Sequence, residues 1–166
     1  MKKTILITGS TDGIGKLAAI KLAKAGHAVF LHGRNPEKLA RVIAEVKRLT
    51  GTDEVDGFVA DFSDLAAVGS MATEVSEALP VLDVLINNAG VYKSSQAKSK
   101  AGYDLRFAVN YLAPFTLTEG LLPLLRASGT ARVINLSSAA QAPVDVAALK
   151  GSVLLPTQSA YAQSKL

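Results

Sequence analysis

The feature that most constrains the fold is a regular alternation of short apolar runs with longer segments of helical spacing. The short runs are expected to be strands and cover residues 4–7, 28–31, 55–60, 81–86 and 132–136. The longer segments are expected to be helices and cover residues 14–25, 36–49, 63–79 and 104–125, with a last helix beginning near residue 159. Such alternation is typical of a parallel sheet with helices on both faces. The sequence therefore predicts a doubly wound α/β domain.

Two segments depart from this regular pattern. Pro114 lies inside the long helical segment and predicts a kink there, because proline lacks the N–H of the helical ladder. Residues 141–157 show no clear period and are expected to form a loop. In open parallel sheets, ligands bind beyond the carboxyl ends of the strands. The residues that follow each predicted strand are therefore the candidates for a functional site.

Composition excludes several classes of protein. The 166 residues make a single domain over 1–166, and 49% hydrophobic against 19% charged residues favours a packed core over disorder. The formal charge of +4 is mild and its basic residues are scattered, so we expect no nucleic-acid partner. The absence of cysteine excludes disulfides and thiolate metal sites, and no metal is expected. The first apolar run is too short for a signal peptide and no stretch is long enough to span a membrane, so we expect a soluble, cytoplasmic protein.

The first predicted strand leads directly into a glycine-rich turn at residues 8–15, TGSTDGIG. Glycine lets the backbone approach a pyrophosphate, and the helix that follows offers free N–H groups and the positive end of its dipole. We interpret the turn as a phosphate cradle, and the alternative is a tight strand-to-helix turn without a ligand. The candidate cofactor contacts in this turn are Gly9, Ser10, Thr11, Asp12, Gly13, Ile14 and Gly15.

The end of the second strand bears on which dinucleotide binds. An acidic residue there would bind the ribose 2′-hydroxyl of NAD, whereas a basic residue suits the 2′-phosphate of NADP. Residues 32–35, HGRN, contain no acid, and Arg34 offers a bidentate guanidinium. The sequence therefore favours NADP over NAD, with a surface arginine as the alternative. His32 is expected to be a packed histidine rather than a ligand.

Polar or small residues also follow the next two strands. Asp61 either accepts a hydrogen bond from an adenine amino group or only caps a helix. The turn at residues 87–90, NNAG, either lets a cofactor pass close by or uses its asparagines to tie up loop backbone. Further candidate cofactor contacts are Asp61, Phe62, Asn88, Ala89 and Gly90.

The candidate catalytic residues lie in the second half of the chain. Ser137 and Ser138 end the fifth strand, where a hydroxyl can bind a substrate carbonyl. Asn110 interrupts an apolar helical stretch, and a buried polar side chain needs a partner or a function. Tyr161 and Lys165 lie four residues apart, on one face of a helix. An ammonium near a phenol stabilises the phenolate, which makes a proton donor and acceptor usable near neutral pH.

Taken in order, these residues resemble the short-chain dehydrogenases/reductases of the non-extended type. The matching motifs are TGSTDGIG at 8–15, Asp61, NNAG at 87–90, Asn110, SS at 137–138 and YAQSK at 161–165. The resemblance implies a Rossmann sheet of order 3-2-1-4-5 and hydride transfer between a nicotinamide cofactor and a carbonyl or alcohol. The long stretch between Ser138 and Tyr161 is similar to the branch of retinol dehydrogenases and protochlorophyllide reductases, which mostly use NADPH.

The resemblance also implies a role for each catalytic candidate. Tyr161 would be the general acid or base. Lys165 would stabilise the Tyr161 phenolate and hold the nicotinamide ribose, so both residues would also contact the cofactor. Ser138, rather than Ser137, would polarise the substrate oxygen, and Asn110 would anchor a water that relays protons.

Members of the family continue past the active-site helix with further strands and a segment that closes over substrate. We therefore expect the C-terminal strands to be missing from this chain and its fifth strand to expose an edge. Two functions stay open. One is an NADP-dependent oxidoreductase of a small-molecule carbonyl or alcohol, expected to be a homo-oligomer in its full-length form, with an interface on the long helices. The other is a non-catalytic nucleotide-binding fragment or interaction module.

Overall fold

The centre of the molecule is a five-stranded parallel sheet, seen in a computed structural model that describes residues 1–166. The strands are β1 (Thr4–Ile7), β2 (Ala28–Gly33), β3 (Val55–Val59), β4 (Val84–Asn87) and β5 (Arg132–Asn135). Their order is β3-β2-β1-β4-β5, and every pairing is parallel. The predicted sheet and strand order are confirmed. The strand order reverses between β1 and β4, which is where such sheets bind ligands.

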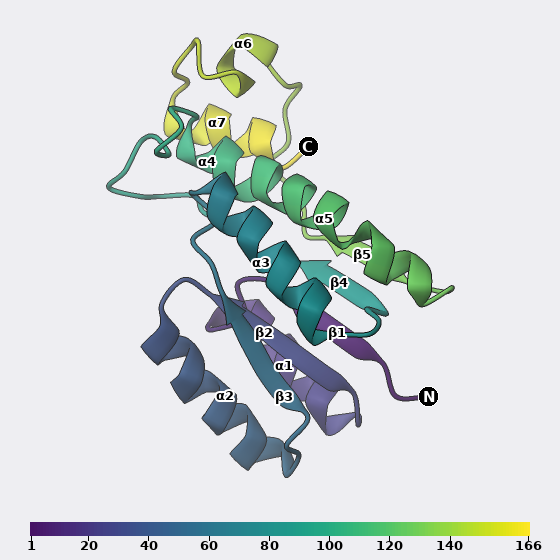
Figure 1. The fold of residues 1–166 in the computed structure, drawn as a ribbon. Coiled ribbons are helices and arrows are strands. Elements are labelled where there is room, and N and C mark those ends of the chain that lie inside the picture. The colour runs from purple at the N-terminus through teal and green to yellow at the C-terminus, as the bar shows by residue number, and fades with distance from the viewer.

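Helices cover both faces of this sheet (Figure 1). The helices are α1 (Gly13–Lys24), α2 (Pro36–Thr50), α3 (Leu65–Ala78), α4 (Leu105–Phe107), α5 (Ala113–Ala127), α6 (Val146–Leu149) and α7 (Thr157–Ser164). Helices α3 and α5 run side by side, whereas α1 packs against α2 on the opposite face. The short helices α6 and α7 gather at the end of the molecule that holds the C-terminus (Figure 1). None of the helices combines the length and the hydropathy that crossing a bilayer requires.

The apolar run of β1 is explained by burial on both sides. Side chains alternate between the two faces of a strand. Leu6 packs under α3 and α5 in a core of 15 buried residues, whereas Ile5 and Ile7 pack under α1 and α2 in a second core of 11. A strand between two helical layers has no solvated face, so its sequence shows a continuous apolar run rather than an alternation.

A π-helical turn lies just before Pro114, where the sequence predicts a kink. The turn η1 (Ala108–Leu112) lies between α4 and α5, and the N–H of Ala113 donates to the carbonyl of Ala108. Pro114 has no N–H with which to continue the ladder four residues back. A wider turn accommodates this loss, and such turns recur at functional sites. The π-helical turn carries Asn110, one of the candidate catalytic residues.

Two expectations about local structure were wrong. Residues 141–157 are not all loop, because α6 forms within them and Asp145 caps it by accepting the N–H groups of Ala147 and Ala148 at 2.8 and 3.2 Å. A single turn of helix is too short to show a period in the sequence. The fourth strand begins at Val84 rather than at residue 81.

The exposed edge expected at the fifth strand is present. Every residue of β5 is exposed, and Val133 and Ile134 keep 40% and 45% of their surface accessible. By contrast, the middle of the sheet is dry: Leu6 and Leu85 have no accessible surface.

The Asp83 side chain forms hydrogen bonds at the amino end of the sheet. Its carboxylate accepts the N–H of Thr4 at 2.8 Å and the hydroxyl of Ser128 at 2.7 Å. These two bonds hold the pKa of Asp83 below its ordinary value. We expect Asp83→Ala to lower the free energy of unfolding by about 1–3 kcal/mol, measured by urea denaturation at pH 7.

The matched control is Asp53→Ala, because the Asp53 side chain is exposed and makes no hydrogen bond. Since the folded pKa of Asp83 is lowered, its contribution is present above the ordinary pKa of 3.8 and is lost as the pH falls further. Equal stability of the two variants at pH 7 would contradict this assignment.

Candidate active site

The glycine-rich turn between β1 and α1 fits closely against the turn that follows β4. Gly9 has a φ of +61°, and a Cβ there would lie 2.7 Å from the Cα of Ala89. A Cβ on Gly15 would lie 2.5 Å from the side-chain nitrogen of Asn88. A side chain at either position would push the two turns apart. Glycine is therefore required here by close approach of backbone, and at Gly9 also by conformation.

Thr8 and Asn88 hold these two turns together by hydrogen bonds. The hydroxyl of Thr8 accepts the N–H groups of Asn88 and Ala89, both at 3.0 Å. The side-chain amide of Asn88 donates to the carbonyls of Thr8 and Gly9 at 2.8 and 2.9 Å. The Asn88 side chain thus ties up loop backbone, as one of the two interpretations of the NNAG turn proposed.

The start of α1 has backbone N–H groups that are free to bind an anion. The first N–H···O bond of the helix runs from Lys16 to Asp12 at 3.1 Å, which leaves the N–H groups of Ile14 and Gly15 without an intrahelical partner. Asp12 caps the helix through Gly13 at 2.9 Å. These free donors lie at the positive end of the helix dipole.

Ser10 behaves differently from the rest of the turn. It is fully buried, and its hydroxyl donates to the carbonyl of Ile7 at 2.8 Å and accepts the N–H of His32 at 2.9 Å. The Ser10 side chain is therefore part of the framework beneath the turn, and its hydroxyl is not free to bind a cofactor.

A groove of about 610 Å³ runs from the glycine turn along the carboxyl ends of β2, β3 and β4. This volume falls within the range of small-molecule and cofactor sites. The groove brings together nine of the predicted cofactor contacts, namely Gly9, Thr11, Asp12, Arg34, Asp61, Phe62, Asn88, Ala89 and Gly90. The other predicted contacts lie outside its lining, namely Ser10, Gly13, Ile14, Gly15, Tyr161 and Lys165.

Two cations stand at the β2 end of this groove. Arg34 is exposed and takes part in none of the salt bridges of the chain. Lys38 forms an ion pair with Asp12 at 2.8 Å, and the hydrogen bond from Lys38 is the main reason why the pKa of Asp12 lies below its ordinary value. Sequence reasoning missed Lys38. Its spacing of four residues from Arg34 was the available signal.

Asn110 joins the segment after β4 to α7. Its side-chain oxygen accepts the N–H of Val91 at 2.7 Å, and its amide donates to the carbonyl of Val91 at 3.0 Å and to the hydroxyl of Ser164 at 2.9 Å. The expectation that this polar side chain has a partner is confirmed. Asn110 therefore holds the Val91 segment against the helix that carries Tyr161.

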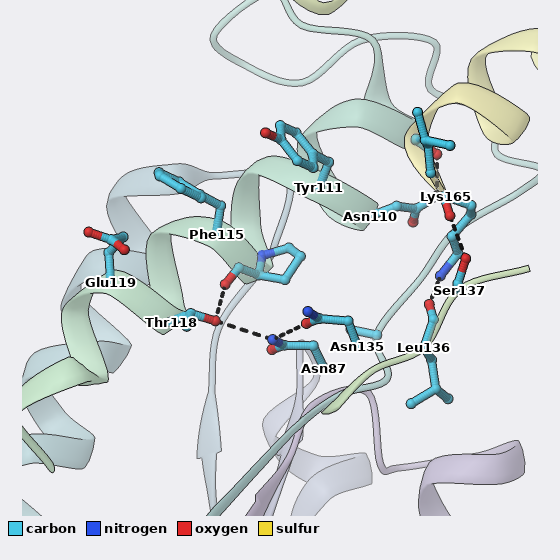
Figure 2. A pocket seen from close by; sticks show the side chains of 14 residues that line it. Asn87, Asn110, Tyr111, Phe115, Thr118, Glu119, Asn135, Leu136, Ser137 and Lys165 are labelled. Carbon is cyan, nitrogen blue, oxygen red and sulfur yellow. Dashed lines mark hydrogen bonds between the residues drawn. The ribbon is translucent and has the colours of Figure 1, made fainter. Parts of the chain in front are cut away.

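Lys165 lies beside Gly90, at the far end of the same row of strand ends. A Cβ on Gly90 would be 3.3 Å from the Lys165 ammonium, which donates to the carbonyl of Leu136 at 2.8 Å (Figure 2). No carboxylate pairs with this ammonium, and its partial burial lowers the pKa of Lys165. Lys165 directly follows α7, which is Thr157–Ser164.

Tyr161 faces the same segment as Lys165. Its ring packs against the ring of Tyr92, with 4.8 Å between the centroids. The Tyr161 ring therefore contacts a side chain that comes two residues after Gly90, the residue beside the Lys165 ammonium. Sequence reasoning did not single out Tyr92, although an aromatic residue so close to the NNAG turn was a visible signal.

The two serines after β5 differ in what their hydroxyls do. The hydroxyl of Ser137 donates to the carbonyl of Lys165 and accepts the side-chain amide of Gln141 at 3.0 Å. The hydroxyl of Ser138 accepts the N–H of Ala140 at 3.1 Å. The Ser137 hydroxyl thus donates its proton to a backbone carbonyl, whereas the Ser138 hydroxyl donates to no group and is free to bind a ligand.

The close approach at Gly9 gives a stability test of this site. We expect Gly9→Ala to lower the free energy of unfolding by about 2–4 kcal/mol, because it combines a positive φ with a clash against Ala89. Thermal or urea denaturation measures the change. Gly69→Ala, in the middle of α3 where a Cβ meets nothing within 4 Å, is the control and should raise stability slightly. A Gly9→Ala variant as stable as the control would refute the close contact.

Comparison with known proteins agrees with this geometry. A family model described as short chain dehydrogenase matches residues 3–166. Human polyprenol dehydrogenase is 36% identical over 170 residues, covering 99% of this chain and 52% of that protein. Human retinol dehydrogenase 13 is 35% identical over 167 residues, covering 99% of this chain and 50% of that protein. A metagenomic short-chain oxidoreductase solved in complex with NADP is 32% identical, with a TM-score of 0.77, covering 98% of this chain and 70% of that one.

The chain spans about half the length of the curated relatives it matches. The match nevertheless extends over nearly all of its own residues and includes the glycine turn, the NNAG turn and the Tyr161–Lys165 pair. The chain therefore belongs to the short-chain dehydrogenase family, in the branch that includes the retinol dehydrogenases.

Proposed function

We propose that this protein is an NADP(H)-dependent oxidoreductase that transfers a hydride between nicotinamide and a carbonyl or alcohol. One observation carries the proposal: the Lys165 ammonium lies beside Gly90 and the Tyr161 ring packs on Tyr92, in the segment that follows β4, and β4 is the neighbour of the strand that leads into the glycine turn. A phosphate cradle and a proton donor thus follow two adjacent strands of the sheet.

The residues present fit a dinucleotide. Gly9 and Gly15 keep the turn free of side chains, and the free N–H groups at the start of α1 suit a pyrophosphate. Asp61 and Phe62 line the groove where adenine would lie, and Gly90 leaves room beside Lys165. The nicotinamide, when bound, supplies or accepts the hydride.

The chain's own residues handle the proton and the substrate oxygen. Tyr161 is the proton donor to the carbonyl oxygen in reduction and the acceptor in oxidation. Ser138 donates a hydrogen bond to the same oxygen, because its proton is not used elsewhere. Lys165 has a lowered pKa because it is partly buried, so its ammonium gives up a proton more readily than an exposed lysine would. Asn110 holds the Val91 segment against α7, because its side chain bonds to both Val91 and Ser164.

Two observations support NADP over NAD. Residues 32–35 at the end of β2 include no carboxylate, and Arg34 lies there without an acidic partner. A metagenomic relative of similar fold was solved with NADP.

We further infer a bulky apolar substrate. The relatives are named for retinol and polyprenol, both apolar alcohols. The segment between Ser138 and Tyr161 also exposes apolar side chains, including Val146 and Leu154, which are each 58% accessible. Apolar side chains exposed in the segment that leads to the candidate proton donor suit an apolar ligand.

The central chemical test is Tyr161→Phe in the protein encoded by the complete reading frame. We expect turnover of carbonyl substrates with NADPH to fall at least about a thousandfold, because the proton donor is lost while the ring and its packing on Tyr92 remain. NADPH binding, followed by the enhancement of its fluorescence, should stay within about threefold. Unchanged turnover would contradict the proposal. NADPH binding without turnover in the unmodified protein would favour a non-catalytic nucleotide-binding module.

Arg34→Ala tests the choice of cofactor. We expect the dissociation constant for NADPH to rise about 10- to 100-fold while that for NADH stays unchanged, because only NADPH carries the 2′-phosphate. The control is Arg48→Ala, which removes an exposed arginine from the last turn of α2. Equal weakening of both cofactors, or of neither, would contradict the assignment to Arg34.

A further inference from the structure

His32 is a buried titratable residue that the proposed chemistry does not use. It lies near the end of β2 with 3% of its surface accessible. Its Nδ1 accepts the N–H of Gly9 at 3.0 Å, and its Nε2 lies 3.0 Å from the carbonyl of Ala60. A ring nitrogen that accepts a hydrogen bond carries no proton, so the proton is on Nε2 and is donated to Ala60. The two bonds therefore select one neutral tautomer.

The backbone of the same residue binds the glycine turn a second time. The N–H of His32 donates to the hydroxyl of Ser10 at 2.9 Å, and the carbonyl of His32 accepts the N–H of Ser10 at 3.0 Å. Residue 32 is thus bonded to both Gly9 and Ser10 of the turn that follows β1. Through Ala60 it is also bonded to the segment that follows β3.

The imidazole also supports the opposite wall of the groove. Its ring stacks on the ring of Phe62, with 4.2 Å between centroids and 24° between planes. Phe62 lines the groove and is 4% accessible, so its inner face is covered by His32. The same side chain therefore touches the turn proposed for the pyrophosphate and the segment proposed for the adenine.

We propose that His32 is a positioning residue for cofactor binding: its neutral imidazole sets the spacing between the glycine turn and the Asp61–Phe62 wall. This inference rests on the proposed dinucleotide site. The bond to Gly9 is the part that matters most, because Gly9 also makes the close contact with Ala89.

The surroundings keep the ring neutral. Burial is the main cause that lowers the pKa of His32, to about 4, while the bond to the Ala60 carbonyl and the nearby Asp61 carboxylate partly oppose it. At neutral pH the ring is therefore uncharged and can accept the Gly9 N–H. A protonated ring would place a proton on Nδ1, facing the N–H of Gly9.

Three substitutions separate the two ring nitrogens. His32→Leu removes both bonds at similar volume. His32→Asn places an oxygen near the position of Nδ1 and keeps an acceptor for Gly9. His32→Gln places an amide nitrogen near the position of Nε2 and keeps a donor for Ala60. The matched control is His27→Leu, because His27 accepts the N–H of Lys3 at the amino end of the sheet, away from the groove.

The readout is the NADPH dissociation constant of each folded variant, with its melting temperature. We expect His32→Leu to weaken binding about tenfold or more, His32→Asn and His32→Gln, which each keep one of the two bonds, to weaken it by less, and His27→Leu to stay within about threefold of the unmodified protein. A purely structural role would instead make affinity follow melting temperature in all variants. Equal affinity of His32→Leu and the unmodified protein, or no rescue by His32→Asn relative to His32→Leu, would overturn the proposal.

If the unmodified protein fails to bind NADPH, the proposed dinucleotide site is wrong and not merely the role of His32. Should His32→Leu fail to fold, ¹⁵N NMR of the unmodified protein still decides the matter. We expect an unprotonated Nδ1 and a protonated Nε2 at pH 6–7. A proton on Nδ1 in that range would overturn the proposal.

Discussion

The contact between the turn after β1 and the turn after β4 is the constraint on which the rest of the site depends. Gly9 comes so close to Ala89 that no side chain fits between them, and the Asn88 amide and Thr8 hydroxyl bridge the two backbones. This contact lies where the strand order reverses, so it sets the depth of the groove at its middle. A short stretch of backbone thus determines how a dinucleotide would lie on this sheet.

From that contact the site extends in both directions. On one side, His32 connects the glycine turn to the Asp61–Phe62 segment, because it bonds to Gly9 and Ala60 and stacks on Phe62. On the other side, Asn110 ties the Val91 segment to α7, which brings Tyr161 and Lys165 to the strand ends. The smaller pocket beneath Lys165, where Asn87 bonds to Asn135 and Thr118, belongs to this second side (Figure 2).

Much of this arrangement could be predicted from the sequence, because burial on both faces makes the strands of a parallel sheet readable as apolar runs. The glycine turn and the NNAG turn were found for the same reason: each directly follows such a run. The hydrogen bonds of His32 and the ion pair between Lys38 and Asp12 could not be predicted from the sequence, because each joins residues that are far apart in the chain. The helix α6 was missed because one turn of helix shows no period in the sequence.

The central claim is that the glycine turn and the Tyr161–Lys165 pair serve one bound dinucleotide. A crystal structure of the complex with NADP⁺ tests it most directly. The account predicts electron density for the pyrophosphate at the N-terminus of α1 and for the nicotinamide ring within hydrogen-bonding reach of Tyr161 or Lys165. Density for the nucleotide at any other surface, or a nicotinamide directed away from residues 90–92, would contradict it.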